Sequence, residues 1–254
     1  MDNLSEGARR WAMIVAVHLA VVLAWHLWVT VAEVPAYVMP TPAATMKSLG
    51  QDYNWVHNTL ITAGEVFGGY ALACLVGIGL ALLFSWFRPL EQTFMPLVVS
   101  LNMIPKVALG PLFIVWFSYG LLPNIIIAFS ICFLPILLTT IRGMREVDPD
   151  LIDLVRALRA SRWQVFTKIQ LPGSLPYVFS GMKVAVVLAV AGAIVGEFIA
   201  SEEGLGYLML QVQVTLDTAA MFMAVLLITL VGVGLYGLVL ILERVFVVSD
   251  ARVE

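Results

Sequence analysis

Three ionisable side chains interrupt otherwise apolar stretches of the sequence and are the first candidates for chemistry. Glu65, Lys106 and Glu197 each lie within an apolar run, and Asn102 is a polar companion to Lys106. An unpaired charge in hydrocarbon is unfavourable by several kcal/mol, so such groups usually pair with one another or line a route for a solute. These four residues are therefore predicted to belong to a transport pathway. For Lys106, snorkelling or pairing with an acid on a neighbouring helix stays open, and Glu197 could simply reach the outer interface.

The sequence contains none of the motifs that hold nucleotide phosphates or metals. It has no Gly-x-x-x-x-Gly-Lys-Ser/Thr phosphate loop, no His-Glu-x-x-His and no Cys-x-x-Cys. No serine or cysteine is placed by the sequence beside a histidine or an acid. We expect no metal site, no cofactor bound by this chain and no enzymatic activity of its own.

The most charged part of the sequence is the connection 142–176, where ten of the Lys, Arg, Asp and Glu residues fall. Asp148-Pro149-Asp150 is a strong helix start, because an Asp caps the helix and a Pro occupies its first position. A second start follows, since the segment from Ser161 to Gln164 has the form of a capping box. Apolar residues recur at helical spacing after the first start: Leu151, Ile152, Leu154, Val155 and Leu158. Two short amphipathic helices are predicted, the second ended by Pro172 and Pro176.

These helices have two interpretations. They could lie on the lipid headgroups as a plain connection. They could also dock on a partner protein, with the apolar residues filling a groove and the surrounding charges setting specificity.

The elements that must position these groups are apolar helices. About 20 helical residues cross the hydrocarbon core of a bilayer, and six runs approach or exceed that length: 11–31, 59–87, 94–117, 121–141, 177–200 and 219–242. The third contains Pro96, Pro105 and Pro111. A short helix is expected within 38–50, capped by Thr41 with Pro42 at its first position. We predict one all-α, polytopic transmembrane domain over residues 1–254, in which Gly64-x-x-x-Gly68 and Gly192-x-x-x-Gly196 let helices approach closely.

Composition supports a membrane protein. The 254 residues are 61% hydrophobic and 12% charged, with a mean hydropathy of +0.97. Soluble domains carry about 25% charged residues, so a soluble enzyme is excluded. A net charge of −3 provides no basic field for nucleic acid. Membrane lipid is the expected surrounding, and nucleic acid is not an expected partner.

The positively charged residues predict the orientation. If the N-terminus is cytoplasmic, the basic residues of the connections and termini fall on the cytoplasmic side, Lys47 falls outside and Lys106 lies within a span. The cytoplasmic set is Arg9, Arg10, Arg88, Arg142, Arg145, Arg156, Arg159, Arg162, Lys168, Lys183, Arg244 and Arg252. Both termini are expected in the cytoplasm, with outer loops near 32–58, 118–120 and 201–218.

The segment 147–176 resembles the coupling loop, or EAA loop, of ABC-importer permeases. The resemblance rests on Val147-Asp148-Pro149, Asp153 to Trp163 and Ile169-x-Leu171-Pro172-Gly173. It continues through Ser180-Gly181-Met182-Lys183, Gly196-Glu197-Phe198 and Gly204-Leu205-Gly206-Tyr207. Upstream, Ile104 to Leu112 is similar to the nitrate, taurine and sulfonate branch, which also includes importers of riboflavin and of thiamine pyrimidine precursors.

The resemblance implies the type I importer permease fold in a bacterial inner membrane. It implies two permease copies, a homodimer, around the pathway. It further implies an ATP-binding subunit that carries ATP and Mg, and an extracytoplasmic substrate-binding protein. Six residues stand at positions of the coupling motif: Asp153, Leu154, Val155, Arg159, Ala160 and Pro172. Leu158 is added as an apolar anchor.

Four positions depart from that motif. Asp153 replaces the family's Glu, Leu154 and Val155 replace two Ala, and Arg159 replaces the Gly that usually permits the bend. Either a left-handed or extended residue near Ala160 makes the bend here, or Arg159 contacts the ATP-binding subunit directly.

The cargo is less defined than the fold. Acids predominate toward the outer face, namely Glu65, Glu202, Glu203 and Asp217, and like charge slows the entry of an anion. Glu65-Val66-Phe67-Gly68-Gly69-Tyr70 is similar to the heterocycle importers of the branch. We expect a small heterocycle such as riboflavin or a thiamine pyrimidine precursor, and the alternative is a sulfonate, taurine or nitrate type of anion.

Two other classes of function remain to be tested. An ion-coupled secondary transporter would use Glu65, Lys106 and Glu197 without an ATP-binding partner. A membrane enzyme or assembly factor would need a nucleophile and a base, for which the sequence offers no constellation. Neither class requires two amphipathic helices in the cytoplasm, so the sequence favours the importer.

Overall fold

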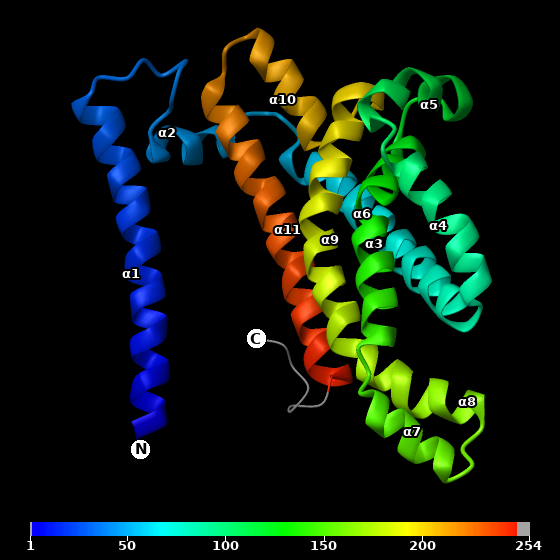
Figure 1. Cartoon of the computed structure of the whole chain (residues 1–254). Coiled ribbons are helices and arrows are strands. Elements are labelled where there is room, and N and C mark those ends of the chain that lie inside the picture. The colour runs from blue at the N-terminus through cyan, green and yellow to red at the C-terminus, as the bar shows by residue number, and fades with distance from the viewer. Residues whose placement is uncertain (1, 248–254) are drawn as a thin grey trace. The chain divides into compact units, whose positions relative to one another are not determined.

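The computed structural model describes residues 2–247, and within them the side chains of residues 2–6, 149 and 156 are not described. Every regular element of the described chain is a helix, which confirms the all-α prediction (Figure 1). Arg252, one of the basic residues used to predict orientation, lies outside the described residues. Contacts divide the chain into two compact units, Met1–Trp55 with Leu208–Leu226 and Val56–Tyr207 with Leu227–Glu254.

The first unit contains α1 (Asp2–Val31) and α2 (Pro42–Lys47). The predicted cap of α2 is confirmed, because Thr41 Oγ1 accepts from the backbone N–H of Ala44 at 3.2 Å. The Trp25 ring stacks on Phe222 with 5.6 Å between centroids, and Tyr53 donates to Asp217 Oδ2 at 2.9 Å. The hydrogen bond to Asp217 is the main reason that the pKa of Tyr53 lies above its ordinary value. These side-chain contacts hold the parts of the first unit together.

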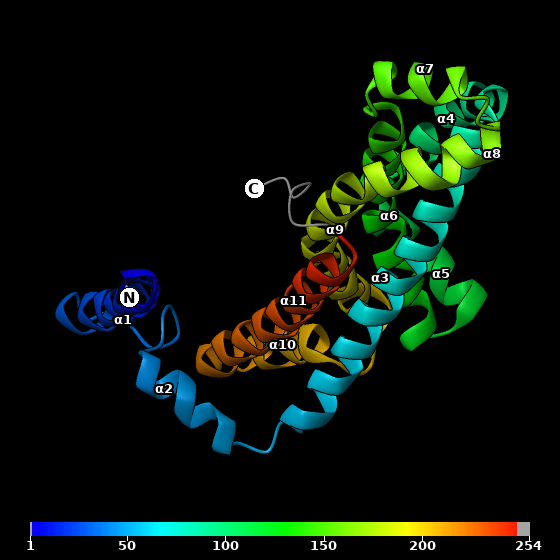
Figure 2. The same ribbon diagram turned by 90° about the horizontal axis from the view of Figure 1, so that it is seen from below.

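The second unit is centred on three long helices: α3 (Trp55–Trp86), α6 (Leu121–Arg145) and α9 (Leu171–Ala200). Helices α6 and α9 lie side by side (Figures 1 and 2). Close approach depends on small residues, as predicted for Gly192 and Gly196. A Cβ atom at Gly192 would lie 2.7 Å from Ala128 Cα, and one at Gly196 would lie 2.8 Å from Asn124 Oδ1.

Five described helices are long and apolar enough to cross a membrane: Gly7–Val31, Trp55–Trp86, Leu121–Arg145, Arg162–Ala200 and Thr218–Phe246, the last being α11. They coincide with five of the six predicted runs. The remaining run, 94–117, is not one straight helix. It consists of α4 (Arg88–Asn102), a 3-10 turn Lys106–Leu109 and α5 (Gly110–Phe117), and the two parts differ in direction by 78°. Counting this bent pair as one span gives six.

Proline explains the bend in the third run. Pro105 has no N–H to donate and disfavours helical backbone in the residue before it, so α4 ends before it is reached. Pro111 stands in the first turn of α5, where the missing donor is harmless. Pro96 is accommodated inside α4.

The expected outer loop 201–218 contains a helix that the sequence reasoning missed. Helix α10 (Leu205–Val214) is ten residues long, too short to cross a membrane and therefore not counted among the spans. Gly204 precedes it with φ +105°, a backbone conformation that suits glycine. Oxygen atoms of Thr62 and Glu197 accept hydrogen bonds from the N–H groups of Leu205 and Gly206, with which the helix begins.

Candidate functional site

The predicted pair of short helices is present as α7 (Pro149–Ala157) and α8 (Arg162–Val165), a hairpin at one end of the second unit (Figures 1 and 2). Asp148 Oδ1 accepts from the N–H of Asp150 at 2.9 Å, as expected for the residue that starts α7. The predicted capping box is also present. Gln164 N–H donates to Ser161 Oγ at 3.2 Å, and Ser161 N–H donates to Gln164 Oε1 at 2.7 Å.

Arg159 makes the bend between the two helices. Its φ is 61°, in the left-handed region, and the following Ala160 N–H donates to Val155 O at 3.0 Å. This bond closes a Schellman motif, whose left-handed position is usually occupied by glycine. Of the two alternatives that the sequence left open, the left-handed residue near Ala160 is therefore the one observed, and it is Arg159 itself.

The outward side of the hairpin carries a row of exposed apolar side chains. Leu154, Leu158 and Trp163 are 59%, 75% and 63% exposed. Leu151 is also exposed, and Val155 and Ala160 are half-buried. The acidic Asp153 is exposed as well. An exposed cluster of large apolar residues with a polar margin is typical of a protein-binding surface.

Aromatic contacts join the hairpin to the end of α3. The Arg162 guanidinium lies 4.7 Å from the centroid of the Trp86 ring and donates to the Trp86 carbonyl oxygen. Trp163 and Phe166 meet the same ring edge-on at 5.8 and 5.1 Å. We call Trp86, Arg162, Trp163 and Phe166 the aromatic clasp. Because Arg162 and Trp163 belong to α8 and Phe166 to the turn that follows it, these contacts join the hairpin to α3.

The expected end of the second helix at Pro172 and Pro176 is wrong. A π-helical turn, Phe166–Gln170, follows α8 and runs directly into α9, so helical backbone extends from Arg162 to Ala200. Pro172 stands in the first turn of α9 and Pro176 inside it. A π-turn widens the helix and pairs each N–H with a more distant carbonyl, which relieves the clash that a proline ring makes with the preceding turn.

A second cluster of functional candidates is buried at the opposite end of α3. Glu65 and Glu197 are 0% and 1% exposed, and their carboxyl groups lie close enough to interact directly. Asn124 Nδ2 donates to Glu65 Oε1 at 2.7 Å, and Thr62 Oγ1 donates to Glu197 Oε1 at 2.5 Å. We call Thr62, Glu65, Asn124 and Glu197 the polar cluster.

Glu197 also caps α10. Its Oε2 accepts from the N–H groups of Gly206 and Tyr207, and Thr62 Oγ1 accepts from Leu205 N–H at 2.9 Å. These are among the first N–H groups of the helix, which have no partner within it and are stabilised by a carboxylate. The polar cluster therefore fixes where α10 begins.

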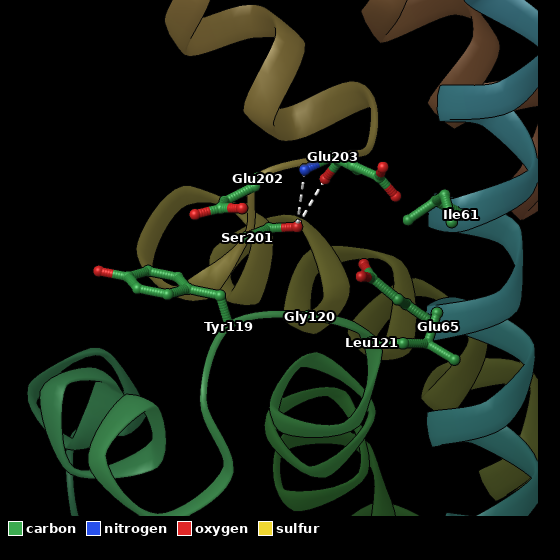
Figure 3. Close-up of a pocket in the computed structure, with 8 residues that line it drawn as sticks. All are labelled: Ile61, Glu65, Tyr119, Gly120, Leu121, Ser201, Glu202 and Glu203. Atoms are coloured by element: carbon green, nitrogen blue, oxygen red, sulfur yellow. Dashed lines mark hydrogen bonds between the residues drawn. The ribbon is translucent and has the colours of Figure 1, made fainter.

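One face of the polar cluster borders a cavity of about 370 Å³ (Figure 3). The cavity lies among α3, the turn before α6 and the turn after α9, and its lining residues are Ile61, Glu65, Tyr119, Gly120, Leu121, Ser201, Glu202 and Glu203. Glu65 Oε2 is buried and has no hydrogen-bond partner.

Lys106 and Asn102 do not join the polar cluster. The Lys106 ammonium donates to the backbone carbonyls of Leu101, Asn102 and Ile104 at 3.2, 2.9 and 3.1 Å. These carbonyls lie where α4 ends, and a cation stabilises a helix C-terminus. Lys106 thus donates hydrogen bonds to backbone carbonyls at the end of its own broken helix. This is a third arrangement besides snorkelling and pairing with an acid.

Three partners were missed by sequence reasoning. Asn124 and Thr62 are short polar residues within apolar runs, and Asn124 follows Pro123 at the start of a predicted span. A polar residue at such a position could have been taken as a partner for a buried acid. Nothing in the sequence pointed to Trp86, which acquires its role only because the bend at Arg159 returns the chain to α3.

Five helices of the described chain, or six with the bent pair, are long and apolar enough to cross a membrane, which indicates a polytopic membrane protein. The chain belongs to the family described as the binding-protein-dependent transport system inner membrane component, which matches residues 73–247. This confirms the resemblance to ABC-importer permeases. The role of a permease subunit in an inner membrane importer follows from that membership.

Individual relatives support the assignment to the branch that the sequence resembles. The riboflavin transport system permease protein RibX of Chloroflexus aurantiacus is 34% identical over 89% of this chain and 86% of its own length. The formylaminopyrimidine transport permease protein ThiX of Halalkalibacterium halodurans is 29% identical over 82% of this chain and 84% of its own. A putative aliphatic sulfonates transport permease protein, SsuC of Bacillus subtilis, is 27% identical over 89% and 83%.

Solved structures agree on the fold. An inward-facing structure of the MetNI methionine ABC transporter matches with a TM-score of 0.61, covering 74% of this chain and 97% of that chain at 21% identity. At this identity the likeness concerns the fold alone.

Proposed function

We propose that the chain is the pathway-forming permease of an ATP-driven importer and that its α7–α8 hairpin docks into a groove of a separate ATP-binding subunit. The observation that carries this proposal is the exposed row Leu154, Leu158 and Trp163, whose Trp163 packs against Trp86 of α3 in the aromatic clasp. A binding protein would deliver cargo on the opposite side, and a second copy of the chain would complete the pathway. Nucleotide and Mg would be bound by the ATP-binding subunit.

In this proposal Asp153, Leu154, Val155, Leu158, Arg159, Ala160 and Pro172 are the coupling residues. Leu154 and Leu158 act as apolar anchors, and Asp153 lies on the exposed face where a charge can select the partner. Arg159 and Ala160 set the angle between the helices. Pro172 stands in the first turn of α9, where the hairpin continues into that helix. A displacement of the hairpin would therefore move a long helix of the pathway.

The termini are proposed to face the cytoplasm, together with the hairpin. The ends of α6 and the hairpin carry Arg142, Arg145 and Arg162, whereas acids predominate around the cavity at the opposite end of the second unit. Basic residues concentrate on the cytoplasmic side of membrane proteins.

The cargo is proposed to be a small heterocycle such as riboflavin or a thiamine pyrimidine precursor. The riboflavin and formylaminopyrimidine relatives support this class, and so does the acidic cavity beside Glu65. A sulfonate is the second candidate, on the ground of the sulfonate relative. An anion would meet three carboxyl groups in the cavity, which makes the heterocycle the better fit.

The test is ATP hydrolysis by the complete complex, reconstituted in lipid with loaded binding protein. Leu158→Asp places a charge in the proposed groove and is expected to reduce stimulated hydrolysis at least tenfold, because central apolar anchors contribute about 2 kcal/mol or more. Leu158→Met keeps an apolar side chain of similar volume and is the matched control.

Full stimulation with Leu158→Asp would contradict docking through this row. Uptake by the purified chain alone in a proton or sodium gradient would instead support an ion-coupled transporter that uses the buried pair of Glu65 and Glu197.

A further inference from the structure

The cavity beside the polar cluster has the dimensions of a small-ligand site. Its volume of about 370 Å³ lies near the lower limit of pockets that enclose small molecules, roughly 300–1,000 Å³. Its deepest polar group is the carboxyl of Glu65, which points from α3 toward the turn that carries Gly120 (Figure 3). The cavity therefore presents one fully buried charged or polar group to a molecule the size of a single ring system.

The polar cluster lacks hydrogen-bond donors. Glu65 Oε2 and Asn124 Oδ1 are both buried without a partner. The adjacent Glu197 cannot supply what is missing when it is ionised, because a carboxylate only accepts hydrogen bonds. Asn124 does not line the cavity, so Glu65 Oε2 is the unpaired acceptor that a molecule in the cavity can reach. A buried acceptor without a donor is unfavourable by about 1–3 kcal/mol, so a ligand that donates hydrogen bonds would be stabilised here.

The rim of the cavity complements a planar ring. Tyr119 is 55% exposed and lies across the cavity from Glu65 (Figure 3). Its ring offers an aromatic face for stacking. Glu202 and Glu203 complete the lining on the side of α9, and no lysine or arginine lines the cavity in the described chain. The lining accepts donors and cations and repels anions.

We propose that this cavity is a cargo-binding site for a planar nitrogen heterocycle, which donates N–H groups to Glu65 and stacks on Tyr119. The proposal rests on the proposed importer function and assigns a binding site in this chain to the proposed class of cargo. An aminopyrimidine and the flavin ring system share the required chemistry, since each contains a pyrimidine ring with N–H donors. A free pyrimidine would fit entirely within the cavity, whereas only the pyrimidine edge of a flavin would enter it.

The experiment measures binding to the full chain in lipid nanodiscs together with its ATP-binding subunit. The probes are 4-amino-5-hydroxymethyl-2-methylpyrimidine, riboflavin and ethanesulfonate, followed by equilibrium dialysis. At least one heterocycle is expected to bind, and a tenfold excess of ethanesulfonate is expected not to displace it. Glu65→Gln removes the charge at nearly constant shape and is expected to weaken heterocycle binding at least tenfold.

Two further variants make the test specific. Asp52→Asn removes an exposed acid that does not line the cavity and is expected to leave binding unchanged. Tyr119→Leu leaves the polar cluster intact and is expected to weaken binding at least threefold, so it decides the question if Glu65→Gln does not fold.

Four results would overturn the proposal. They are no binding of either heterocycle, equal binding by wild type and both cavity variants, displacement by ethanesulfonate, or a Glu65-dependent site that Na⁺ fills more tightly than the heterocycles. ATP-driven coupling is scored separately with Leu158→Asp. If no heterocycle binds in the cavity but Leu158→Asp still reduces stimulated ATP hydrolysis, this inference alone is refuted. If a heterocycle binds but Leu158→Asp leaves stimulated hydrolysis unchanged, the importer mechanism alone is refuted.

Discussion

The two ends of α3 contact different kinds of side chain, exposed apolar and aromatic groups at one end and buried polar groups at the other. At one end the aromatic clasp around Trp86 holds an exposed hairpin, and large apolar side chains remain open to a partner. At the other end Glu65 and Glu197 are buried, and their carboxyl groups accept hydrogen bonds from Asn124 and Thr62. Exposed apolar groups indicate a surface that binds another protein. A buried carboxyl group with an unpaired oxygen indicates a site for a small molecule that donates hydrogen bonds.

One continuous helix connects these ends. Glu65 and Trp86 are 21 residues apart along α3, which contains no proline. At 1.5 Å per residue this separation is about 32 Å, close to the thickness of the hydrocarbon core. A displacement of the hairpin can therefore reach the polar cluster through one continuous helix.

The largest effect is expected from Glu197→Ala. The substitution removes the acceptor of Thr62, Gly206 and Tyr207, so several buried donors lose their partner and α10 loses its cap. We expect the free energy of unfolding to fall by about 3 kcal/mol or more. Chemical unfolding in detergent measures this change. The exposed Glu202→Ala is the control and should stay within about 0.5 kcal/mol of wild type. Equal stability of the two variants would remove the polar cluster as a structural centre.

Trp86→Ala should mainly affect the other end. It deletes the ring that Arg162, Trp163 and Phe166 contact. Because Trp86 is half-buried, we expect a loss of about 2 kcal/mol of stability, together with at least a tenfold fall in cargo uptake per ATP hydrolysed. Simultaneous assays of uptake and hydrolysis in proteoliposomes give this ratio. Trp86→Phe retains an aromatic ring and should recover most of it. An unchanged ratio with Trp86→Ala would show that the clasp does not transmit motion.

A smaller effect is expected from Ser161→Ala. The hydroxyl of Ser161 accepts from Gln164 N–H and forms half of the capping box. Its loss should destabilise α8 by about 1 kcal/mol, since N-cap replacements by alanine fall in that range. Amide hydrogen exchange across residues 161–165 should accelerate about fivefold, while exchange in α3 stays constant. Ser161→Asp, which preserves a capping oxygen, is the matched control. Equal exchange in all three proteins would contradict the assignment of the cap.

The smallest effect is expected from Arg159→Gly, with the opposite sign. Arg159 adopts φ 61°, which a glycine reaches without steric cost. The substitution should stabilise the hairpin by about 0.5–1 kcal/mol and slow amide exchange in α7. Stimulated ATP hydrolysis separates the two roles of this residue. Unchanged stimulation means that the bend is its whole function, and a clear loss means that the guanidinium also binds the partner.

The sequence predicted the local structure of the hairpin well. Asp148 and the Ser161–Gln164 box are local signals, because each cap is made by residues within three positions of one another. The apolar runs likewise identified the long helices. The site residues were harder, because Asn124 and Trp86 act through residues far away in the sequence. Glu65 and Glu197 were found as candidates, but their contact depends on how α3, α6 and α9 pack.

The errors have physical causes as well. The run 94–117 was predicted as one span interrupted by prolines, and what the prolines alone did not predict is the bend of 78° and the bonds from Lys106 to carbonyls at the end of α4. Pro172 was expected to end a helix, yet the π-turn before it lets the backbone continue. In both cases a proline alone does not determine whether a helix ends, bends or widens, since that depends on which groups can take up the freed carbonyls.

The most direct test of the account is a photo-cross-link from position 158. A benzophenone amino acid replaces Leu158 in the complete complex, and the same residue replaces the exposed Leu101 of α4 as the control. Docking of the hairpin predicts a covalent product with the ATP-binding subunit from position 158 and none from position 101. Absence of that product from position 158, in a complex that still hydrolyses ATP and imports cargo, would contradict the account.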